Sequence, residues 1–129
     1  MKIPIIIDTD PGHDDALAIM LAVKSEMFEI KAITTVAGNS TIENTTRNAR
    51  YILKLLERED IPVYSGSAQP LQQELVKAVV HGDSGLEGID PDNEPNLTDN
   101  AVEKIIEIVK ENKEITIVAL GPLTNIAQA

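Results

Sequence analysis

The sequence predicts an α/β fold, with an open and mostly parallel sheet that has helices on both faces. Three runs rich in β-branched residues alternate with segments whose apolar residues recur at helical spacing. The first run, residues 3–7, is continuously apolar, which is typical of a strand covered on both faces. Strand, helix, strand order of this kind indicates right-handed βαβ units. Because 129 residues with 43% hydrophobic side chains suffice for one core, we expect one folding unit over residues 1–129.

The expected strands are recognised by β-branched residues between polar or glycine borders. Residues 3–7 form the first, residues 30–36 the second and residues 115–120 the third. Residues 61–64 indicate a further short strand. Helical segments between these runs would cross from one parallel strand to the next.

Helices are expected where apolar side chains repeat on one face. Residues 14–24 show this register, and Ser40-Thr41-Ile42-Glu43 has the pattern of a capping box ahead of a second helix. A third helix is expected to start at Thr98. Residues 81–97 are rich in Gly, Asp, Asn and Pro and predict a long loop, a kind of segment that is often functional.

The C-terminal residues predict a fold that is cut short. Pro122 stands where a helix would begin, and residues 123–129 supply fewer than two helical turns. A helix of that length is marginal by itself. We therefore expect a sheet edge or an apolar face that something else covers, and we expect the chain to form a homo-oligomer.

Composition excludes several classes of function. The formal net charge of -10 repels phosphate backbones and anionic lipid, so we expect neither nucleic acid nor membrane as a partner. The chain has no cysteine, which excludes disulfides, thiolate zinc sites and a cysteine nucleophile. The apolar run at residues 3–7 is far too short for a signal peptide or a membrane span. We expect a cytoplasmic protein.

Four aspartates directly after the first strand form the most informative motif. Asp8, Asp10, Asp14 and Asp15 crowd into eight positions, where like charges raise one another's pKa unless a cation is bound. The carboxyl ends of strands are where open α/β sheets bind ligands. Helix capping explains any one of these residues, but it does not explain all of them together. Hard oxygen ligands without cysteine indicate Ca²⁺ or Mg²⁺, and the clustering favours calcium.

Residues 5–16 resemble the N-terminal signature of inosine-uridine-type nucleoside hydrolases. Three later segments agree with that family in order, namely residues 35–39, residues 81–86 and residues 120–127. The resemblance implies that residues 1–129 are the N-terminal portion of a single nucleoside hydrolase domain. It implies calcium-dependent hydrolysis of the N-glycosidic bond of ribonucleosides to ribose and free base, in purine or pyrimidine salvage.

The resemblance also implies roles for single residues. Asp10 would coordinate calcium and act as general base toward water, Asp15 would be a second ligand, and Thr124 would contribute its main-chain carbonyl. Asp14 and Asn39 would bind ribose hydroxyls. These carboxylates would also stabilise an oxocarbenium-like sugar.

His81 would lie near the nucleobase by the same resemblance. Taken one by one, however, Asn39 also suits a turn, His81 a structural position, and Thr124 the first turn of an ordinary helix. Only the order and spacing of these residues after the acidic loop favour the functional interpretation.

Members of the family are much longer, and their later half adds a further aspartate to calcium, more ribose contacts and a histidine beside the leaving base. We therefore expect the lone chain to bind calcium weakly and to turn over nucleosides slowly or not at all. One alternative is a Mg²⁺-dependent phosphatase with an aspartate nucleophile, since Asp8-Thr9-Asp10 also suits that class. Another is a non-catalytic remnant that binds calcium or ribose.

Overall fold

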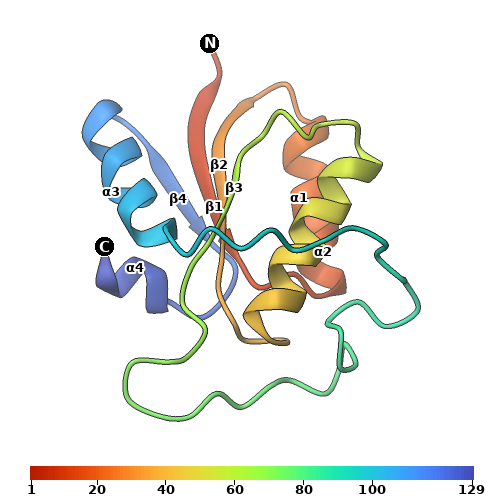
Figure 1. Cartoon of the computed structure of the whole chain (residues 1–129). Helices are drawn as coiled ribbons and strands as arrows, with labels where there is room; N and C mark the ends of the chain where they lie inside the picture. Colours follow the sequence, from red (N-terminus) through yellow and green to blue (C-terminus); the bar gives the residue numbers. More distant parts are fainter.

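The computed structural model describes residues 1–129 and has one parallel sheet between two layers of helices (Figure 1). This arrangement confirms the predicted α/β class. No helix combines the length and hydrophobicity needed to cross a bilayer. In chain order the elements are β1 (Ile3–Thr9), α1 (His13–Lys24), β2 (Phe28–Thr35), α2 (Ile42–Leu55), β3 (Val63–Ser65), α3 (Ala101–Glu111), β4 (Thr116–Ala119) and α4 (Thr124–Gln128).

The strand order places a change of direction beside β1. The sheet runs β3-β2-β1-β4, so the chain moves outward from β1 to β3 and then returns to add β4 on the other side of β1. Helices α1 and α2 cover one face, while α3 and α4 lie on the other (Figure 1). Loops that leave β1 and β4 therefore diverge to opposite faces. In open α/β sheets the crevice at such a point is the usual ligand site.

The core fixes where β1 ends. Ile5 and Ile7 are buried against Ile19 of α1 and Ile52 of α2. Ile6 is fully buried as well and points to the opposite face, because successive strand side chains alternate. A shift of one residue would expose this set, so packing sets the register of β1. The acidic residues that follow β1 are placed by that register.

Helix α2 starts one residue later than the sequence pattern suggests. Its N-cap is Thr41, whose side chain accepts a hydrogen bond from the Asn44 N–H. The capping box predicted at Ser40 is therefore wrong by one position. Ser40 instead donates its hydroxyl to the Asp83 carbonyl of the long loop. The tertiary contact takes precedence over the local cap.

Helix α3 begins at Ala101, so the start predicted at Thr98 is wrong. The Thr98 N–H donates to the Ser65 hydroxyl, and the Thr98 hydroxyl accepts from the Ser65 N–H. This reciprocal contact holds Thr98 in an extended link beside β3. Residues 66–100 contain no helix or strand, so the predicted loop at residues 81–97 is longer than expected.

Strand β4 lies at the edge of the sheet and pairs only with β1. Its residues are exposed or half-buried, in contrast to the buried β1. A shallow apolar hollow of about 350 Å³ lies between α3, β4 and α4, and among its lining residues are Ile105, Val109, Ile117 and Ile126. The structure thus has the open edge and the apolar face that the sequence predicts.

Candidate functional site

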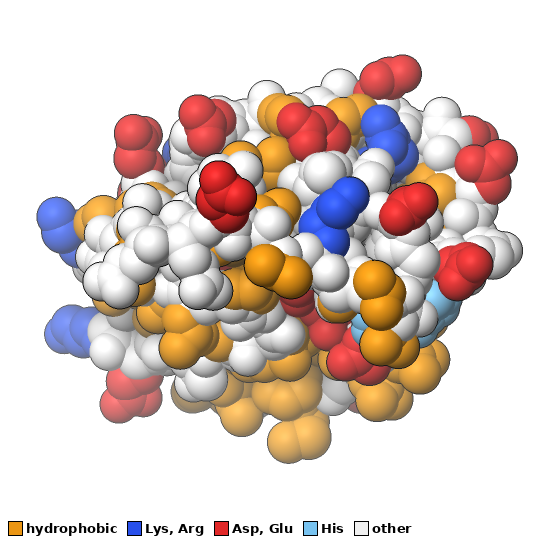
Figure 2. Space-filling view, turned by 90° about the horizontal axis from the view of Figure 1, so that it is seen from below, with side chains coloured by type: hydrophobic (Ala, Val, Ile, Leu, Met, Phe, Trp, Pro, Cys, Tyr) orange, Lys and Arg blue, Asp and Glu red, His pale blue; other side chains and the backbone are white.

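The acidic loop lies at the carboxyl edge of the sheet, where β1 passes into α1. Parallel pairing sets Asp8 beside Ala119 of β4, so the segment after β4 lies next to this loop. Seen from this edge, acidic side chains lie in a recess, with apolar side chains and histidine nearby (Figure 2). The loop therefore lies at the change of direction in strand order.

Asp10 and Asp15 form a buried pair of carboxyl groups. Asp10 is 6% exposed and Asp15 is 4% exposed. Burial raises the pKa of Asp10 to about 7, and the Asp15 charge adds to this shift. Burial likewise raises the pKa of Asp15, against a hydrogen bond of 2.7 Å from the Thr9 hydroxyl that favours its ionised form. Two buried carboxyl groups without a cationic partner fit a site for a cation.

Asn39 holds Asp10 from the end of β2. Its N–H donates to Asp10 Oδ2 at 2.8 Å, and its side-chain Nδ2 donates to the Asp10 carbonyl at 2.8 Å. These bonds fix both the main chain and the carboxyl group of Asp10. The structure thus brings Asn39 to the acidic loop, with part of its amide group already in use.

Two glycines line Asp10 on its other sides. A Cβ on Gly38 would overlap Asp10 Oδ2 and would lie 2.9 Å from Pro122 Cγ. A Cβ on Gly121 would lie 2.7 Å from Asp10 Oδ1. Both positions need glycine because the Asp10 carboxyl group occupies the space.

Thr124 is the first residue of α4, shortly after the turn at Gly121 and Pro122, and is 8% exposed. The contact between Gly121 and Asp10 places the turn before Thr124 against the acidic loop. Residues from the ends of β1, β2 and β4 therefore converge at Asp10. Of the residues expected from the sequence, Asp15 and Asn39 contact Asp10 here, and Thr124 follows the Gly121-Pro122 segment that lies against Asp10.

Asp14 and His81 form a second group beside the pair. Asp14 is largely exposed at the first turn of α1, and its Oδ1 lies 3.4 Å from His81 Nε2. The main-chain N–H of His13 donates to His81 Nδ1 at 3.3 Å, which makes that nitrogen an acceptor. In its neutral form His81 therefore carries its proton on Nε2, facing Asp14. His13 Nε2 lies 2.9 Å from the Glu87 carbonyl.

The loop that carries His81 is tied to α2. Asn48, which is 1% exposed, donates its side-chain N–H to the Ser84 carbonyl at 2.7 Å and to the Pro11 carbonyl at 3.3 Å. Asn44 Nδ2 donates to the Ser40 hydroxyl, which in turn contacts the loop. Sequence reasoning missed these residues because an Asn within a helix pattern gives no sign of a long-range contact.

Asp8 is also missing from the predicted site residues. It is fully buried, and its Oδ1 accepts from the Thr34 hydroxyl at 2.5 Å and from Asn125 Nδ2 at 2.9 Å. Its Oδ2 has no partner. Burial raises the pKa of Asp8, and both hydrogen bonds oppose that shift. A carboxyl group enclosed in this way cannot reach a phosphoryl group, which argues against the phosphatase alternative.

The acidic loop offers only part of a set of metal ligands. The structure has no group of three or more His, Asp or Glu side chains arranged to hold one. The acidic loop offers a pair, Asp10 and Asp15, with the Thr124 turn adjacent. All of these donors are oxygens, and the pair is buried and lacks a counter-ion, so the residues present fit part of a calcium shell.

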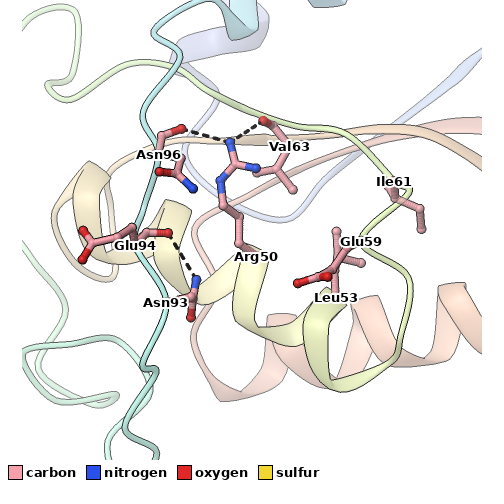
Figure 3. A pocket seen from close by; sticks show the side chains of 8 residues that line it. All are labelled: Arg50, Leu53, Glu59, Ile61, Val63, Asn93, Glu94 and Asn96. Atoms are coloured by element: carbon pink, nitrogen blue, oxygen red, sulfur yellow. Dashed lines mark hydrogen bonds between the residues drawn. The ribbon is translucent and has the colours of Figure 1, made fainter.

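A separate hollow of about 160 Å³ lies between α2, β3 and residues 93–96 of the long loop (Figure 3). Arg50 lies in it and donates to the carbonyls of Val63 at 2.9 Å, Pro95 at 2.7 Å and Asn96 at 3.0 Å. Burial lowers the pKa of Arg50. Because carbonyls of the chain itself accept hydrogen bonds from the guanidinium, Arg50 has a structural role and clamps residues 95–96 to β3. None of the cavities is lined by Asp10 or by the other candidate residues.

Comparison with known proteins gives one consistent result. Residues 5–129 match the family described as inosine-uridine preferring nucleoside hydrolase. The pyrimidine-specific ribonucleoside hydrolase RihA of Salmonella typhi is 49% identical over 132 residues, and that of Photobacterium profundum is 52% identical over 132 residues. Each match covers 98% of this chain but 42% of the relative, so the chain spans less than half the length of these proteins.

Solved structures agree with the sequence relatives. A plant nucleoside hydrolase superposes with a TM-score of 0.88 at 45% identity, over 98% of this chain and 42% of that chain. A purine-preferring ribonucleoside hydrolase from Gardnerella vaginalis gives a TM-score of 0.88 at 34% identity, with the same coverage of 98% and 42%. The fold described above is therefore also the fold of the matched part of these enzymes.

Proposed function

This chain belongs to the inosine-uridine preferring nucleoside hydrolase family, and we propose that it is the N-terminal portion of a single domain that hydrolyses the N-glycosidic bond of ribonucleosides. The observation that carries the proposal is the buried pair Asp10 and Asp15 at the carboxyl end of β1, beside the turn before Thr124. Relatives that are named pyrimidine-specific and purine-preferring share this fold. The proposed substrate class is therefore ribonucleosides in general.

Calcium is the proposed cofactor, with Asp10, Asp15 and the Thr124 carbonyl as the ligands that this chain supplies. A calcium ion bound there would supply positive charge that keeps both carboxylates ionised, acidifies a neighbouring water and attracts ribose hydroxyls. More than half of each relative lies outside the matched region, and we propose that the remaining ligands come from there.

The proposed roles of the other residues follow from their positions. Asp10 is the general base that takes the proton from the attacking water, and the two hydrogen bonds from Asn39 hold it in place. Asp14 is exposed and free to accept from a ribose hydroxyl. His81 presents Nε2 beside Asp14, where a nucleobase would extend from the sugar. Carboxylates around the ring stabilise the positive charge that develops as the bond breaks.

A calcium titration by calorimetry tests the ligand set. We expect the chain to release or absorb heat on calcium binding and the signal to be lost in Asp10→Ala. Glu43→Ala is the matched control, since Glu43 is an acidic residue on α2 that has no assigned role in the site. Binding that survives in Asp10→Ala would contradict the proposed site.

A nucleoside turnover assay tests the incomplete site. We expect slow hydrolysis or none from this chain, because no residue here replaces the ligands and the proton donor that the resemblance assigns to the later half. Efficient hydrolysis of inosine or uridine by the purified chain would overturn that expectation. Binding of calcium and ribose without any turnover, even with the missing part supplied, would favour the non-catalytic alternative.

A cytoplasmic location and self-association through the open β4 edge are also part of the proposal. The edge offers unpaired main-chain groups beside an apolar hollow, which is the kind of surface that a second chain can cover.

A further inference from the structure

Asn125 joins three segments of the chain underneath the candidate site. Its side chain is fully buried. Nδ2 donates to Asp8 Oδ1 at 2.9 Å and to the Thr35 carbonyl at 2.9 Å. Oδ1 accepts from the Ser67 N–H at 2.9 Å. One amide group thus binds the end of β1, the end of β2 and the loop after β3.

The space around this amide group is closed on the β3 side. A Cβ on Gly66 would overlap Asn125 Oδ1 and would lie 2.6 Å from Nδ2. The backbone of residue 66 therefore approaches the amide as closely as glycine permits. Among the side-chain oxygen and nitrogen atoms of Asp8 and Asn125, only Asp8 Oδ2 has no hydrogen-bond partner.

Besides Asn125, helix α4 is held by packing against α3 and by a hydrogen bond of 2.9 Å from the Ser67 hydroxyl to Gln128 Oε1. It has five residues and no side-chain cap, and an isolated helix of that length is not stable. The main chain before it is tied to β1 by a bond of 2.8 Å from the Leu120 N–H to the Asp8 carbonyl. Asn125 supplies the buried polar contacts on the other side of Thr124.

We propose that Asn125 is a positioning residue that holds Thr124, whose main-chain carbonyl is a proposed calcium ligand, in place after the turn that lies against Asp10. The inference deepens the proposed function and depends on it for its calcium readout. Thr124 lies between the Gly121-Pro122 turn, which touches Asp10, and Asn125, which is bound to the strand ends. Both sides of its peptide unit are therefore fixed. Supporting residues of this kind typically change metal affinity by about 10- to 100-fold when they are removed.

The test compares Asn125→Ala with Ile52→Val, which removes one methylene from the core on α2 and leaves the polar network intact. We expect calcium affinity to fall by about 10-fold or more in Asn125→Ala and to stay unchanged in Ile52→Val. Titrations are run at a temperature where circular dichroism shows both variants folded. Amide hydrogen exchange is expected to accelerate at Ser67 and Leu120 in Asn125→Ala alone.

A reciprocal swap separates positioning from general stability. Asp8→Asn combined with Asn125→Asp restores a donor on residue 8 and acceptors for the Ser67 N–H, while the Thr35 carbonyl loses its donor. We expect this double variant to recover part of the calcium affinity that Asn125→Asp alone loses.

The outcomes distinguish the two proposals. If Asn125→Ala binds calcium like the parent chain, the inference is overturned while the proposed function stands. If the parent chain itself binds no calcium, the proposed function fails, and hydrogen exchange alone then tests the positioning role of Asn125. Unchanged exchange at Ser67 and Leu120 then overturns the positioning role, and faster exchange confined to Asn125→Ala supports it.

Discussion

At the scale of single residues, the site depends on glycines that leave room for Asp10. Gly38→Ala would force a methyl group into the Asp10 carboxyl group and toward Pro122. We expect a loss of stability of roughly 1–3 kcal/mol and weaker calcium binding, because the carboxyl group must move. Chemical denaturation and calorimetry measure the two effects.

Gly88→Ala is the control for this substitution. A Cβ on Gly88 would meet nothing within 4 Å, although its φ of +92° carries a conformational cost. We expect Gly88→Ala to leave calcium affinity unchanged. Equal affinities in Gly38→Ala and the parent chain would show that Asp10 does not need its observed position.

The raised pKa of Asp10 predicts how stability depends on pH without metal. Folding raises this pKa from 3.8 to about 7, so the folded state prefers the protonated form. The associated stability is fully present below the unfolded pKa of 3.8 and is lost as pH rises through about 7. We expect the metal-free chain to lose roughly 2–4 kcal/mol between about pH 5 and about pH 8.

Urea denaturation at several pH values measures this change. Asp10→Asn removes the titrating carboxyl group at this position and is expected to reduce the pH dependence, while Asp8 and Asp15 keep their own raised pKa values. Excess calcium is expected to do the same, because a cation compensates the ionised pair. Stability that rises with pH in metal-free buffer would be inconsistent with the buried pair.

At the scale of elements, the segment that follows the long loop is held to β3 by Arg50. Arg50→Lys keeps the charge but cannot reach the carbonyls of Val63, Pro95 and Asn96 together. We expect a loss of stability of roughly 1–3 kcal/mol and faster proteolysis within residues 93–97. Arg58→Lys is the control, since Arg58 is exposed and pairs only with Asp60. Equal proteolysis of both variants would exclude the clamp.

The strands and helices were largely predictable, because apolar runs and helical spacing record burial directly. The acidic loop was predictable too, since like charges at a strand end are costly without a ligand. The starts of α2 and α3 were not predictable, because Ser40 and Thr98 make contacts with Asp83 and Ser65. Such contacts join positions far apart in sequence, and no local pattern encodes them.

The buried polar residues under the site were missed for the same reason. Asp8 looked like one more member of the acidic loop, yet it is enclosed and bound to Thr34 and Asn125. Asn125 looked like a residue of a short helix. The roles proposed for Asp10, Asp14, Asp15, Asn39, His81 and Thr124 remain predictions that the experiments above can decide.

At the scale of the whole molecule, the open β4 edge and its apolar hollow are the surface proposed for self-association. Val109 is 41% exposed in α3 beside this hollow, and Leu21 is 74% exposed in α1, away from it. We expect Val109→Asp to reduce self-association, because a charge opposes burial of that face. Leu21→Asp is expected to have little effect.

Sedimentation velocity over a range of concentrations measures this difference. Equal self-association of the two variants would place the contact elsewhere on the molecule. Addition of the remaining part of a relative as a separate chain is expected to compete with self-association, because both cover the same edge.

The bond between Asp8 and Asn125 spans 117 positions and joins the first strand to the last helix. A chain emerging from the ribosome is therefore extended by 117 further positions after Asp8 before the partner that completes the network is present. Loop closure over such a separation is slow compared with local helix formation. The proposed ion site consequently matures only after α4 has been made, and metal capture would report that β1 and α4 have met.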